Sequence, residues 1–355
     1  MRSNMICGLV LLSALSGHEC LAAGGVGGSK AFNPDISVNF LGLVLRDTRG
    51  SNLRTDARHN GISFQEGEMQ FIADVDPYFR ASALFSVAQK DNSTDFGIDP
   101  EEVYAESISL PVVTVRGGKF KAALGKHNQQ HTHAFPFIDA PLINQDLLGT
   151  EGLNEAGVSA AALIPAPWFL ELTLQALGTT NTKIFNSPGS GDYAGVASLK
   201  NLWDLSDSTT FEVSTYGTEG PNSGGGQSYV FGSDIILKWR PAEGGKYKAV
   251  IWQTEYLNGN LQSTANPRLS GIASWVQYQF AERWWVQARA EYEGLPPKAT
   301  GLTAKRKQSA LLGFFPSEFS GFRVQYDHLL ADQGDGHAVE LQWNFSIGAH
   351  PAHAY

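Results

Sequence analysis

The sequence predicts an all-β fold, a closed antiparallel transmembrane β-barrel of about sixteen strands. Three observations predict it: sixteen stretches in which apolar and polar residues alternate, connections that are by turns short and long, and aromatic residues near the short connections. Successive side chains of a strand point to opposite faces, so a wall between lipid and water must alternate every second residue. Short periplasmic turns and longer external loops explain the two kinds of connection.

Alternation is clearest in the last expected strand, where Val339, Leu341 and Trp343 share one face while Glu340 and Gln342 share the other. No boundary between two domains is visible, so we expect residues 36–355 to form one barrel. In chain order, the expected strands cover 36–45, 62–75, 78–87, 101–110, 112–121, 154–164, 168–177, 193–202, 208–217, 228–240, 246–257, 269–281, 284–294, 307–316, 320–330 and 337–347.

The connections support this division of the chain. The short ones contain the Pro, Gly, Asp and Ser that tight turns require, and lie at 76–77, 111, 165–167, 204–207, 241–245, 281–283 and 317–319. The long ones cover 46–61, 88–100, 122–153, 178–192, 218–227, 258–268, 295–306 and 331–336. Near the short connections we expect an aromatic belt at the membrane interface, made of Tyr78, Trp168, Phe169, Trp203, Trp239, Tyr247, Phe280, Trp284, Trp285, Phe314, Phe315 and Phe319.

The N-terminus has the pattern of an export signal, covering residues 1–23, with an apolar segment after Arg2 and small residues before the expected cut at Ala22 or Ala23. Residues 24–35 are expected to be a flexible leader. Both cysteines, Cys7 and Cys20, precede the cut, which excludes a disulfide framework in the mature chain. Lipidation at Cys20 is the alternative, although the residues before it lack the apolar character of such a site.

Composition excludes several classes of protein. The net charge of -9 and the pI near 5.5 argue against nucleic-acid binding, which needs clustered Lys and Arg. No internal segment approaches the roughly 20 apolar residues of a spanning helix. No Gly-x-Ser-x-Gly or His-Glu-x-x-His motif occurs, so we predict no enzyme. A pairing of His328 with Ser309 across neighbouring strands is the weak alternative, and it is generic.

The longest connection, 122–153, joins the fifth and sixth expected strands and is apolar between Phe135 and Ile143. Water would penalise that apolar stretch, so we expect the loop to fold into the barrel and narrow the pore. A surface loop or a partner-docking site is the alternative. The same loop holds His127, His131 and His133, whose spacing suits zinc or copper with carboxylate help from Asp139 or Glu151. Solvated histidines are the alternative interpretation, and no cofactor is otherwise required.

Alternation also predicts which charges face the lumen. Acidic residues outnumber basic ones there, which favours cations or neutral solutes; the acidic set is Glu66, Glu68, Asp74, Glu102, Glu106, Glu171, Glu212, Asp234, Glu291, Asp327 and Glu340, and the basic set is Arg80, Arg116, Lys238, Arg289 and Arg323. Opposite charges that only brace the wall are the alternative. Around the loop, Lys119, Lys121 and Lys126 could draw anions. The expected pore-lining residues are Lys119, Lys121, Lys126, Phe135, Phe137, Asp139, Arg80, Arg116, Glu102 and Glu106.

Four segments carry a resemblance to a known group of proteins: FQEGEMQFIADVDPYFRASALFSV, EEVYAESISLP, VRGGKFKAALGKHNQQHTHAFPFIDAPLINQDLLGTEGL and the final SIGAHPAHAY. They resemble zinc-regulated TonB-dependent outer-membrane receptors, and the first three are more distantly similar to phosphate-selective porins. The resemblance implies metal-responsive transport, with His127, His131 and His133 as the matching residues. Two departures are visible: no room for a receptor plug between Ala23 and Ile36, and an acidic lumen where phosphate porins are basic.

We therefore expect a passive, porin-like channel in the outer membrane of a Gram-negative bacterium. Its partners would be outer-membrane lipids and small solutes or metal ions, with no nucleic acid, and its apolar outer face would permit a homotrimer. The alternative function is a zinc-binding outer-membrane receptor or scavenger without a conducting pore, and a structural barrel with a blocked lumen is a third.

Overall fold

The computed structural model describes residues 34–49, 59–89, 95–187, 189, 191–260, 268–296, 304–332 and 334–348. The expected signal peptide, 1–23, and nearly all of the leader, 24–33, lie outside the described residues, as do His350 and His353. Among the described residues, no helix has the length and apolarity needed to cross a membrane.

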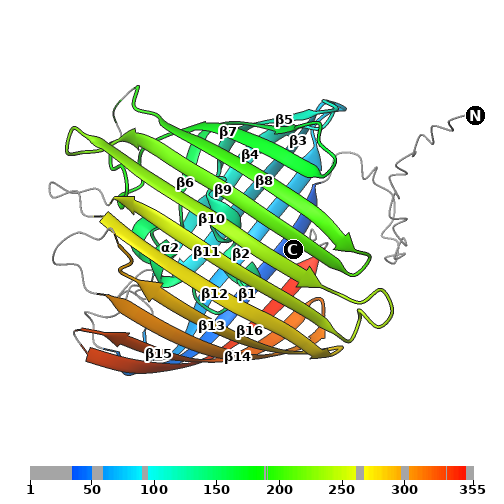
Figure 1. Ribbon diagram of the computed structural model, residues 1–355, viewed down its shortest axis with the longest axis vertical. Helices are drawn as coiled ribbons and strands as arrows, with labels where there is room; N and C mark the ends of the chain where they lie inside the picture. The colour runs from blue at the N-terminus through cyan, green and yellow to red at the C-terminus, as the bar shows by residue number, and fades with distance from the viewer. Residues whose placement is uncertain are drawn as a thin grey trace, which may run out of the picture. The chain divides into compact units, whose positions relative to one another are not determined.

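Sixteen antiparallel strands form one closed barrel in which each strand pairs with its sequence neighbours and the last closes on the first (Figure 1). The expected fold is confirmed. The strands are β1 (Asp35–Asp47), β2 (Gly61–Asp74), β3 (Phe79–Gln89), β4 (Phe96–Ser107), β5 (Val113–Lys121), β6 (Asn154–Leu163), β7 (Phe169–Leu177), β8 (Ala194–Ser206), β9 (Thr209–Pro221), β10 (Gln227–Trp239), β11 (Ala249–Asn260), β12 (Arg268–Ala281), β13 (Trp284–Glu293), β14 (Lys305–Ser317), β15 (Ser320–Ala331) and β16 (Gly334–Gly348).

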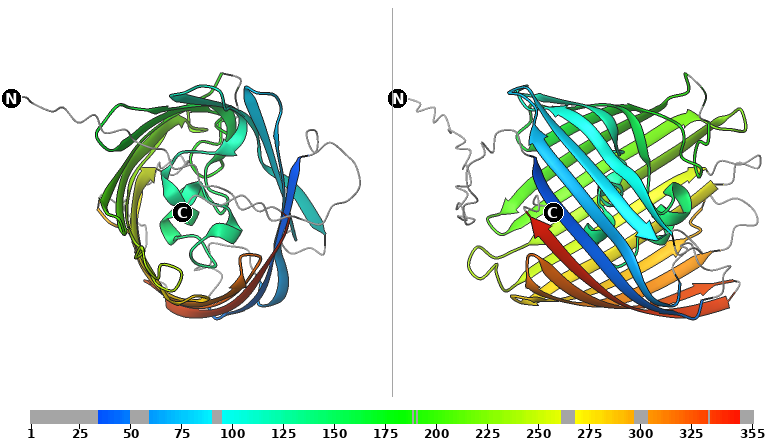
Figure 2. Two further views of the ribbon diagram at one scale, coloured as in Figure 1. Left: turned by 90° about the vertical axis from the view of Figure 1, so that its right-hand side faces the viewer. Right: turned by 180° about the vertical axis from the view of Figure 1, so that it is seen from behind.

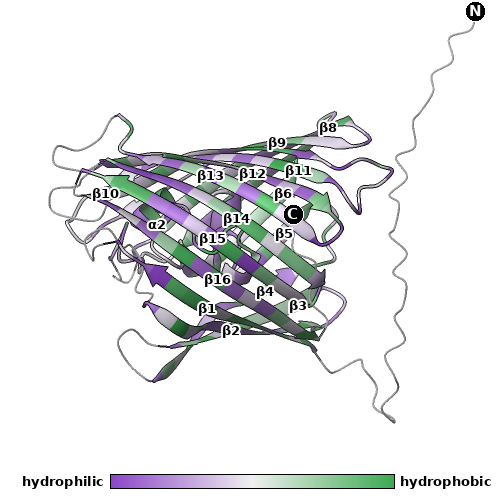
Figure 3. Cartoon of the chain, turned by 90° about the horizontal axis from the view of Figure 1, so that it is seen from below, coloured by the Kyte–Doolittle hydropathy of each residue, from purple (hydrophilic) through white to green (hydrophobic). Residues whose placement is uncertain are grey.

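Side chains alternate between the two faces of the wall as predicted. In β15, Arg323, Gln325 and Asp327 are buried inside the barrel, whereas Phe322 and Val324 lie on the outer surface. Figure 3 shows the same alternation as bands of polar and apolar residues along the strands. The barrel therefore has an apolar outer wall and a polar inner wall, as lipid and water demand.

The strand register shifts at five places among the described strands, and two of these shifts concern β4 and β2. Leu84 and Phe85 are consecutive in β3, but their partners in β4 are Glu102 and Pro100. Glu101 of β4 is therefore an extra residue. A bulge places two consecutive residues opposite one and redirects a side chain. Glu101 and Glu102 consequently both point into the barrel. A similar shift in β2 brings Gln65 to Gln342, whose side chains are hydrogen-bonded at 2.7 Å.

The two ends of the barrel differ as expected, but the lengths of the connections do not alternate strictly. The expected long connection 331–336 is reduced to the two residues between β15 and β16, because Gly334 and Gly336 continue the strand ladder. At the opposite end, nine residues separate β10 from β11. The alternation of short and long connections is therefore only a tendency in this chain. The extent of strand pairing decides how long each connection is.

The expected aromatic belt is largely on the outer surface. Trp168 and Trp203 lie 6.0 Å apart, and Trp284 and Phe314 lie 4.6 Å apart, measured between ring centroids. Trp285 departs from the prediction, since it shares the inward register of Gln287 and Arg289. Phe315 does so too, because its ring lies against Gly313 and Gly321 of the inner face. A residue next to a turn can face either way, and only its register decides.

Between β5 and β6 the chain turns into the barrel and forms three short helices: α1 (Gly125–Asn128), the 3-10 helix η2 (Thr132–Ala134) and α2 (Leu142–Leu148). Seen along the barrel axis, this segment occupies the interior (Figure 2). Its apolar residues take part in three cores inside the barrel, the smallest of which joins Leu142 to Leu329 and Ala331. Leu147 and Leu148 pack with wall residues of β5 and β7 to β12, and Phe137 and Ile138 pack with Leu43, Leu45, Ala273, Trp275, Leu311 and Ala338. The prediction of an inward-folded loop is confirmed.

Candidate functional site

The inserted loop, residues 122–153, crosses the lumen and touches most of the wall. α1 contacts β9 and β10, η2 contacts β1, and α2 contacts β11, β12 and β13. Helices this short are not stable alone, so tertiary contacts must hold them in place. Contacts between loop and wall therefore fix the position of the loop inside the barrel.

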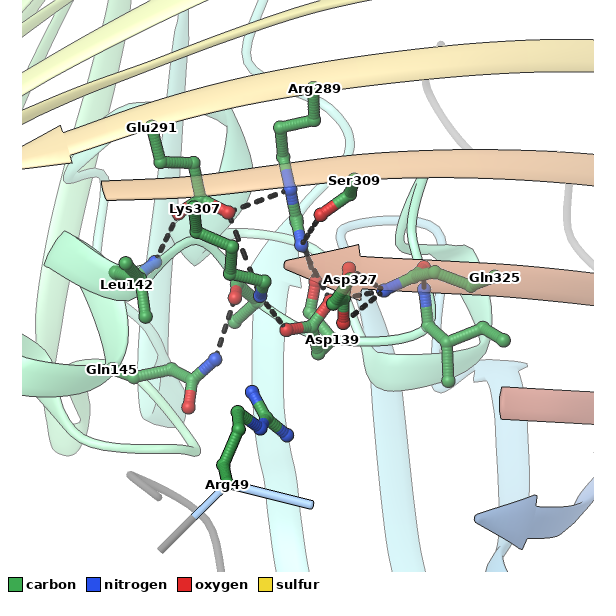
Figure 4. Close-up of polar contacts among 12 residues, drawn as sticks. Arg49, Asp139, Leu142, Gln145, Arg289, Glu291, Lys307, Ser309, Gln325 and Asp327 are labelled. Carbon is green, nitrogen blue, oxygen red and sulfur yellow. Dashed lines mark hydrogen bonds and ion pairs between the residues drawn. The ribbon is translucent and has the colours of Figure 1, made fainter. Parts of the chain in front are cut away.

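Asp139 forms several of these contacts (Figure 4). Its carboxylate pairs with Arg289 at 2.5 Å and with the ammonium of Lys307. The guanidinium of Arg289 also donates to the Asp139 carbonyl at 2.9 Å and lies 4.3 Å from the centre of the Phe137 ring. The side chains of Asp139, Arg289 and Lys307 are at most 4% exposed. We call these three residues the Asp139 anchor.

Neighbouring polar side chains bind the loop backbone around this anchor. Glu291 accepts the N–H of Leu142 at 2.5 Å and forms an ion pair with Arg289 at 2.8 Å. Gln325 accepts the N–H of Ile138 at 2.8 Å and donates to Asp139 at 2.8 Å. Polar side chains of the inner wall thus satisfy buried backbone groups of the loop, which would be costly to leave without a partner.

A second polar contact fastens the beginning of the loop to β2 and β4. The two ring nitrogens of His131 face the two carboxylates of the β4 bulge, with Nδ1 2.7 Å from Glu101 and Nε2 3.1 Å from Glu102. The adjacent His133 forms an ion pair with Glu68 of β2. Burial lowers the pKa of His131, but the hydrogen bonds to both carboxylates outweigh burial and raise it to about 9. We call Glu68, Glu101, Glu102, His131 and His133 the His131 cluster.

His127 lies apart from the other two loop histidines. Its ring packs on Phe135, with centroids 4.3 Å apart, and neither nitrogen has a hydrogen-bond partner among the described residues. Burial, followed by the positive charges of Arg289 and Lys121, lowers its pKa to about 3, so it is neutral. The structure therefore does not bring the three predicted histidines to one point, because His127 of α1 lies against Phe135 and near Asp139 and Arg289.

The predicted lysines occupy three different environments. Lys119 shares the outward register of Val103 and bonds the Pro100 carbonyl at 2.7 Å, so the structure corrects its expected place in the pore. Lys121 is buried and donates to the Glu151 carbonyl at 3.3 Å. Lys126 is inside, where burial and then the charge of Lys238 lower its pKa to about 8.

Arg80, Arg116 and Glu106 form a row on the inner wall toward the short turns. Arg80 pairs with Asp74 at 2.7 Å and lies opposite Glu106, which binds Arg116 at 2.8 Å. Arg116 also lies 4.2 Å from the centre of the Tyr104 ring. Arg80 and Asp74 remain about half exposed, so this row faces water in the lumen rather than the loop.

Sequence reasoning missed two important residues. Lys307 is fully buried in the Asp139 anchor, and its inward position follows from the register it shares with Ser309 and Leu311. Glu101 had no such signal, because strict alternation assigns it to the outer face and only the bulge turns it inward.

Two groups among the described residues have the geometry of a metal site. Ligand atoms of Glu68, Glu101 and His131 lie within 4.8 Å of one another, as do those of His328, Asp335 and His337. The first group is buried inside the barrel, while the second lies on the outer face at the end of the β15–β16 hairpin. An N/O ligand set of this kind suits zinc and similar divalent metals.

Comparison with solved structures finds proteins with a similar fold. OprB of Pseudomonas putida, solved at high pH, aligns with a TM-score of 0.61 at 7% identity, over 89% of this chain and 94% of that one. The loop L8 deletion mutant of OmpT, an outer membrane protein of Vibrio cholerae, gives 0.59 at 9% identity, over 88% and 99%. The outer membrane channel DcaP of Acinetobacter baumannii gives 0.57 at 9% identity, over 89% and 96%.

This chain has the fold of an outer-membrane porin. At such low identity the similarity shows the fold alone, and on that level the predicted outer-membrane β-barrel is confirmed. The narrower label of a zinc-regulated TonB-dependent receptor is not supported by these similarities. No known family matches the sequence. An uncharacterised protein of Aquifex aeolicus (strain VF5) is 26% identical, and the alignment covers 92% of this chain and 81% of that protein.

Proposed function

We propose that this protein is a channel in the outer membrane of a Gram-negative bacterium and lets small solutes or ions diffuse passively through a constriction made by residues 122–153. The observation that carries the proposal is the route of the loop across the lumen. Buried charged residues of the wall fix this route by binding Asp139 and His131 of the loop. A loop held in this way narrows the lumen without filling it completely.

Cations or neutral solutes are the substrate class that the lumen charge favours. Arg289 and Lys307 are paired with Asp139 and Glu291, and Arg323 is bound to the Phe135 carbonyl at 2.5 Å, so none of the three is open to an anion. Acidic side chains of the inner wall outnumber basic ones, and a narrow channel strengthens their field. The protein supplies width and field and performs no chemistry.

A homotrimer is the assembly we propose. The outer wall is broadly apolar, which a neighbouring barrel can cover as well as lipid can. OmpT of Vibrio cholerae, which has a similar fold, has been solved in a trimer form.

Recording single channels in planar lipid bilayers tests the proposal. The full chain should give stable steps whose reversal potential in a salt gradient indicates cation preference. Replacing residues 125–149 by a short Gly-Ser linker should enlarge the steps, because the constriction is removed. If neither protein conducts, the channel function is wrong.

The alternative is a zinc-binding receptor without a conducting pore, and the buried His131 cluster is the observation that favours it. Both functions allow metal binding, so conductance separates them. The receptor function is favoured if the full chain binds zinc and neither the full chain nor the loop-replaced protein conducts.

A further inference from the structure

We infer that Glu68, Glu101 and His131 form a binding site for one divalent transition-metal ion, which ties the inserted loop to β2 and β4. Glu102 orients the imidazole from its other side. The ligand set differs from the three-histidine set that the sequence predicts, since two strand carboxylates replace His127 and His133. Metal binding stands on this geometry alone, and only its effect on conductance rests on the proposed function.

The geometry of the three ligands supports the site. Their ligand atoms all lie within 4.8 Å of one another, and the residues are 3–9% exposed. They come from two strands and the loop, so one ion would connect segments that are far apart in sequence. Small shifts of these side chains would bring the histidine nitrogen and the carboxylate oxygens to about 2.0–2.2 Å from an ion placed between them.

The two nitrogens of His131 have distinct roles in this arrangement. Nδ1 faces Glu101 at 2.7 Å, and Nε2 lies 3.1 Å from Glu102. Histidine ligands usually donate their second N–H to a carboxylate, which fixes the tautomer and the ring orientation. If Nε2–H donates to Glu102, the lone pair of Nδ1 points toward Glu101. The ion would then take the place of the proton between Nδ1 and the Glu101 carboxylate.

An excess of buried negative charge favours a cation here. Glu66 interacts electrostatically with Glu68, Glu101 and Glu151, so several carboxylates share one region. Neither oxygen of Glu68 accepts a well-formed hydrogen bond among the described residues, although the carboxylate forms an ion pair with His133. Buried carboxylates are costly unless paired, and a divalent ion would neutralise two of them.

The bulge in β4 explains why the wall can provide this site. It turns Glu101 inward beside Glu102, so one strand presents a metal ligand and its orienting partner side by side. Glu68 comes from β2 by ordinary alternation. One imidazole with two carboxylates suits zinc, and also manganese or iron(II), and we choose zinc as the probe.

The test is zinc binding to the full mature chain in detergent, after removal of bound metal with a chelator. Isothermal titration should show one tight site. His131→Ala and Glu101→Gln should weaken it at least tenfold, and Glu102→Gln should weaken it by roughly 10–100-fold, as expected for loss of an orienting partner. Heat-modifiable mobility in electrophoresis verifies that each variant is folded.

His328→Ala combined with His337→Ala is the matched control, because it removes the exposed histidine group and leaves the barrel interior unchanged. Zinc binding should survive in this variant. The inference is wrong if the wild-type chain binds no zinc, or if binding disappears only in the control.

X-ray absorption at the zinc edge of the wild-type protein provides a test that needs no variant. One imidazole nitrogen with carboxylate oxygens is expected, and a shell with two or more imidazoles would contradict the ligand set. Bilayer recording with and without zinc then addresses the loop. Smaller or rarer steps with zinc are expected of a tied loop, while a protein that binds zinc but never conducts would keep the site and reject the channel.

Discussion

Asp139 of the loop and Arg289 of β13 are 150 residues apart in sequence and form a buried ion pair 2.5 Å long, with side chains 4% and 2% exposed. Lys307 binds the other oxygen of the same carboxylate. One loop side chain therefore pairs with two cations of the wall, and Glu291 provides the second negative charge beside them. This arrangement holds the middle of the inserted loop against β13 and β14.

Asp139→Asn should loosen the loop. Removing one partner of a buried ion pair leaves charge without compensation, which costs about 3–5 kcal/mol, although Glu291 still lies near both cations. We expect larger single-channel steps and faster cleavage of the loop by added protease. Asp74→Asn is the control, because that carboxylate is exposed. Unchanged conductance and cleavage would show that Asp139 does not hold the loop.

Acid should weaken docking of the loop through His127. Its pKa is about 3 when docked and about 6.5 in a solvated histidine, so the undocked loop binds more protons. The contribution of neutral His127 to docking is thus fully present above pH 6.5 and is lost as the pH falls toward 3, by about 2 kcal/mol at pH 5. Arg289 of β13 and Lys121 of β5 oppose the added charge, and only Asp139 favours it.

Loop cleavage by a protease active over this range, compared at pH 7 and pH 5, measures the effect. Cleavage should be faster at pH 5 in the wild-type chain. His127→Phe retains an aromatic ring against Phe135 and removes the titration, so its cleavage should differ much less between the two pH values. An equal acid response in both proteins would assign the effect to other groups.

Leu147→Ala should destabilise docking of α2. Leu147 is fully buried in the apolar core inside the barrel, and such truncations cost about 2–5 kcal/mol. We expect noisier channel currents with excursions to larger conductance. Leu199→Ala, on the exposed outer face of β8, is the matched control and should leave the current as it is. Noise that rises equally in both variants would contradict a specific role of α2.

Val324→Arg tests the lipid-facing wall. Val324 lies in the middle of β15 on the outer face, where a cation near the bilayer midplane costs about 2–4 kcal/mol. Denaturant unfolding of the protein in lipid vesicles should reveal the loss, while Val324→Leu should be nearly neutral. A cost below 1 kcal/mol for Val324→Arg would place this residue away from the membrane core.

Much of the fold could be predicted because its cause is local. Lipid outside and water inside force an alternation that is visible within a single strand. Arg323, Gln325 and Asp327 could therefore be assigned to the lumen from sequence. The inward fold of the loop could be predicted for a similar reason, since Phe137 and Ile138 cannot remain in water without cost. Zinc ligation by the loop histidines stays a prediction.

The remaining features depend on residues that meet only when the barrel closes. Glu101 needs the bulge opposite Leu84 and Phe85, and Lys119 loses its lumen position through strand register. His127 and His131 separate because the first packs on Phe135 of the loop while the second binds the carboxylates of β4. By itself, then, the sequence determined a barrel with an apolar exterior, a charged lumen and an inserted loop. Only the tertiary structure decided which charges pair across it, because pairing depends on register and on distances between strands that are remote in sequence.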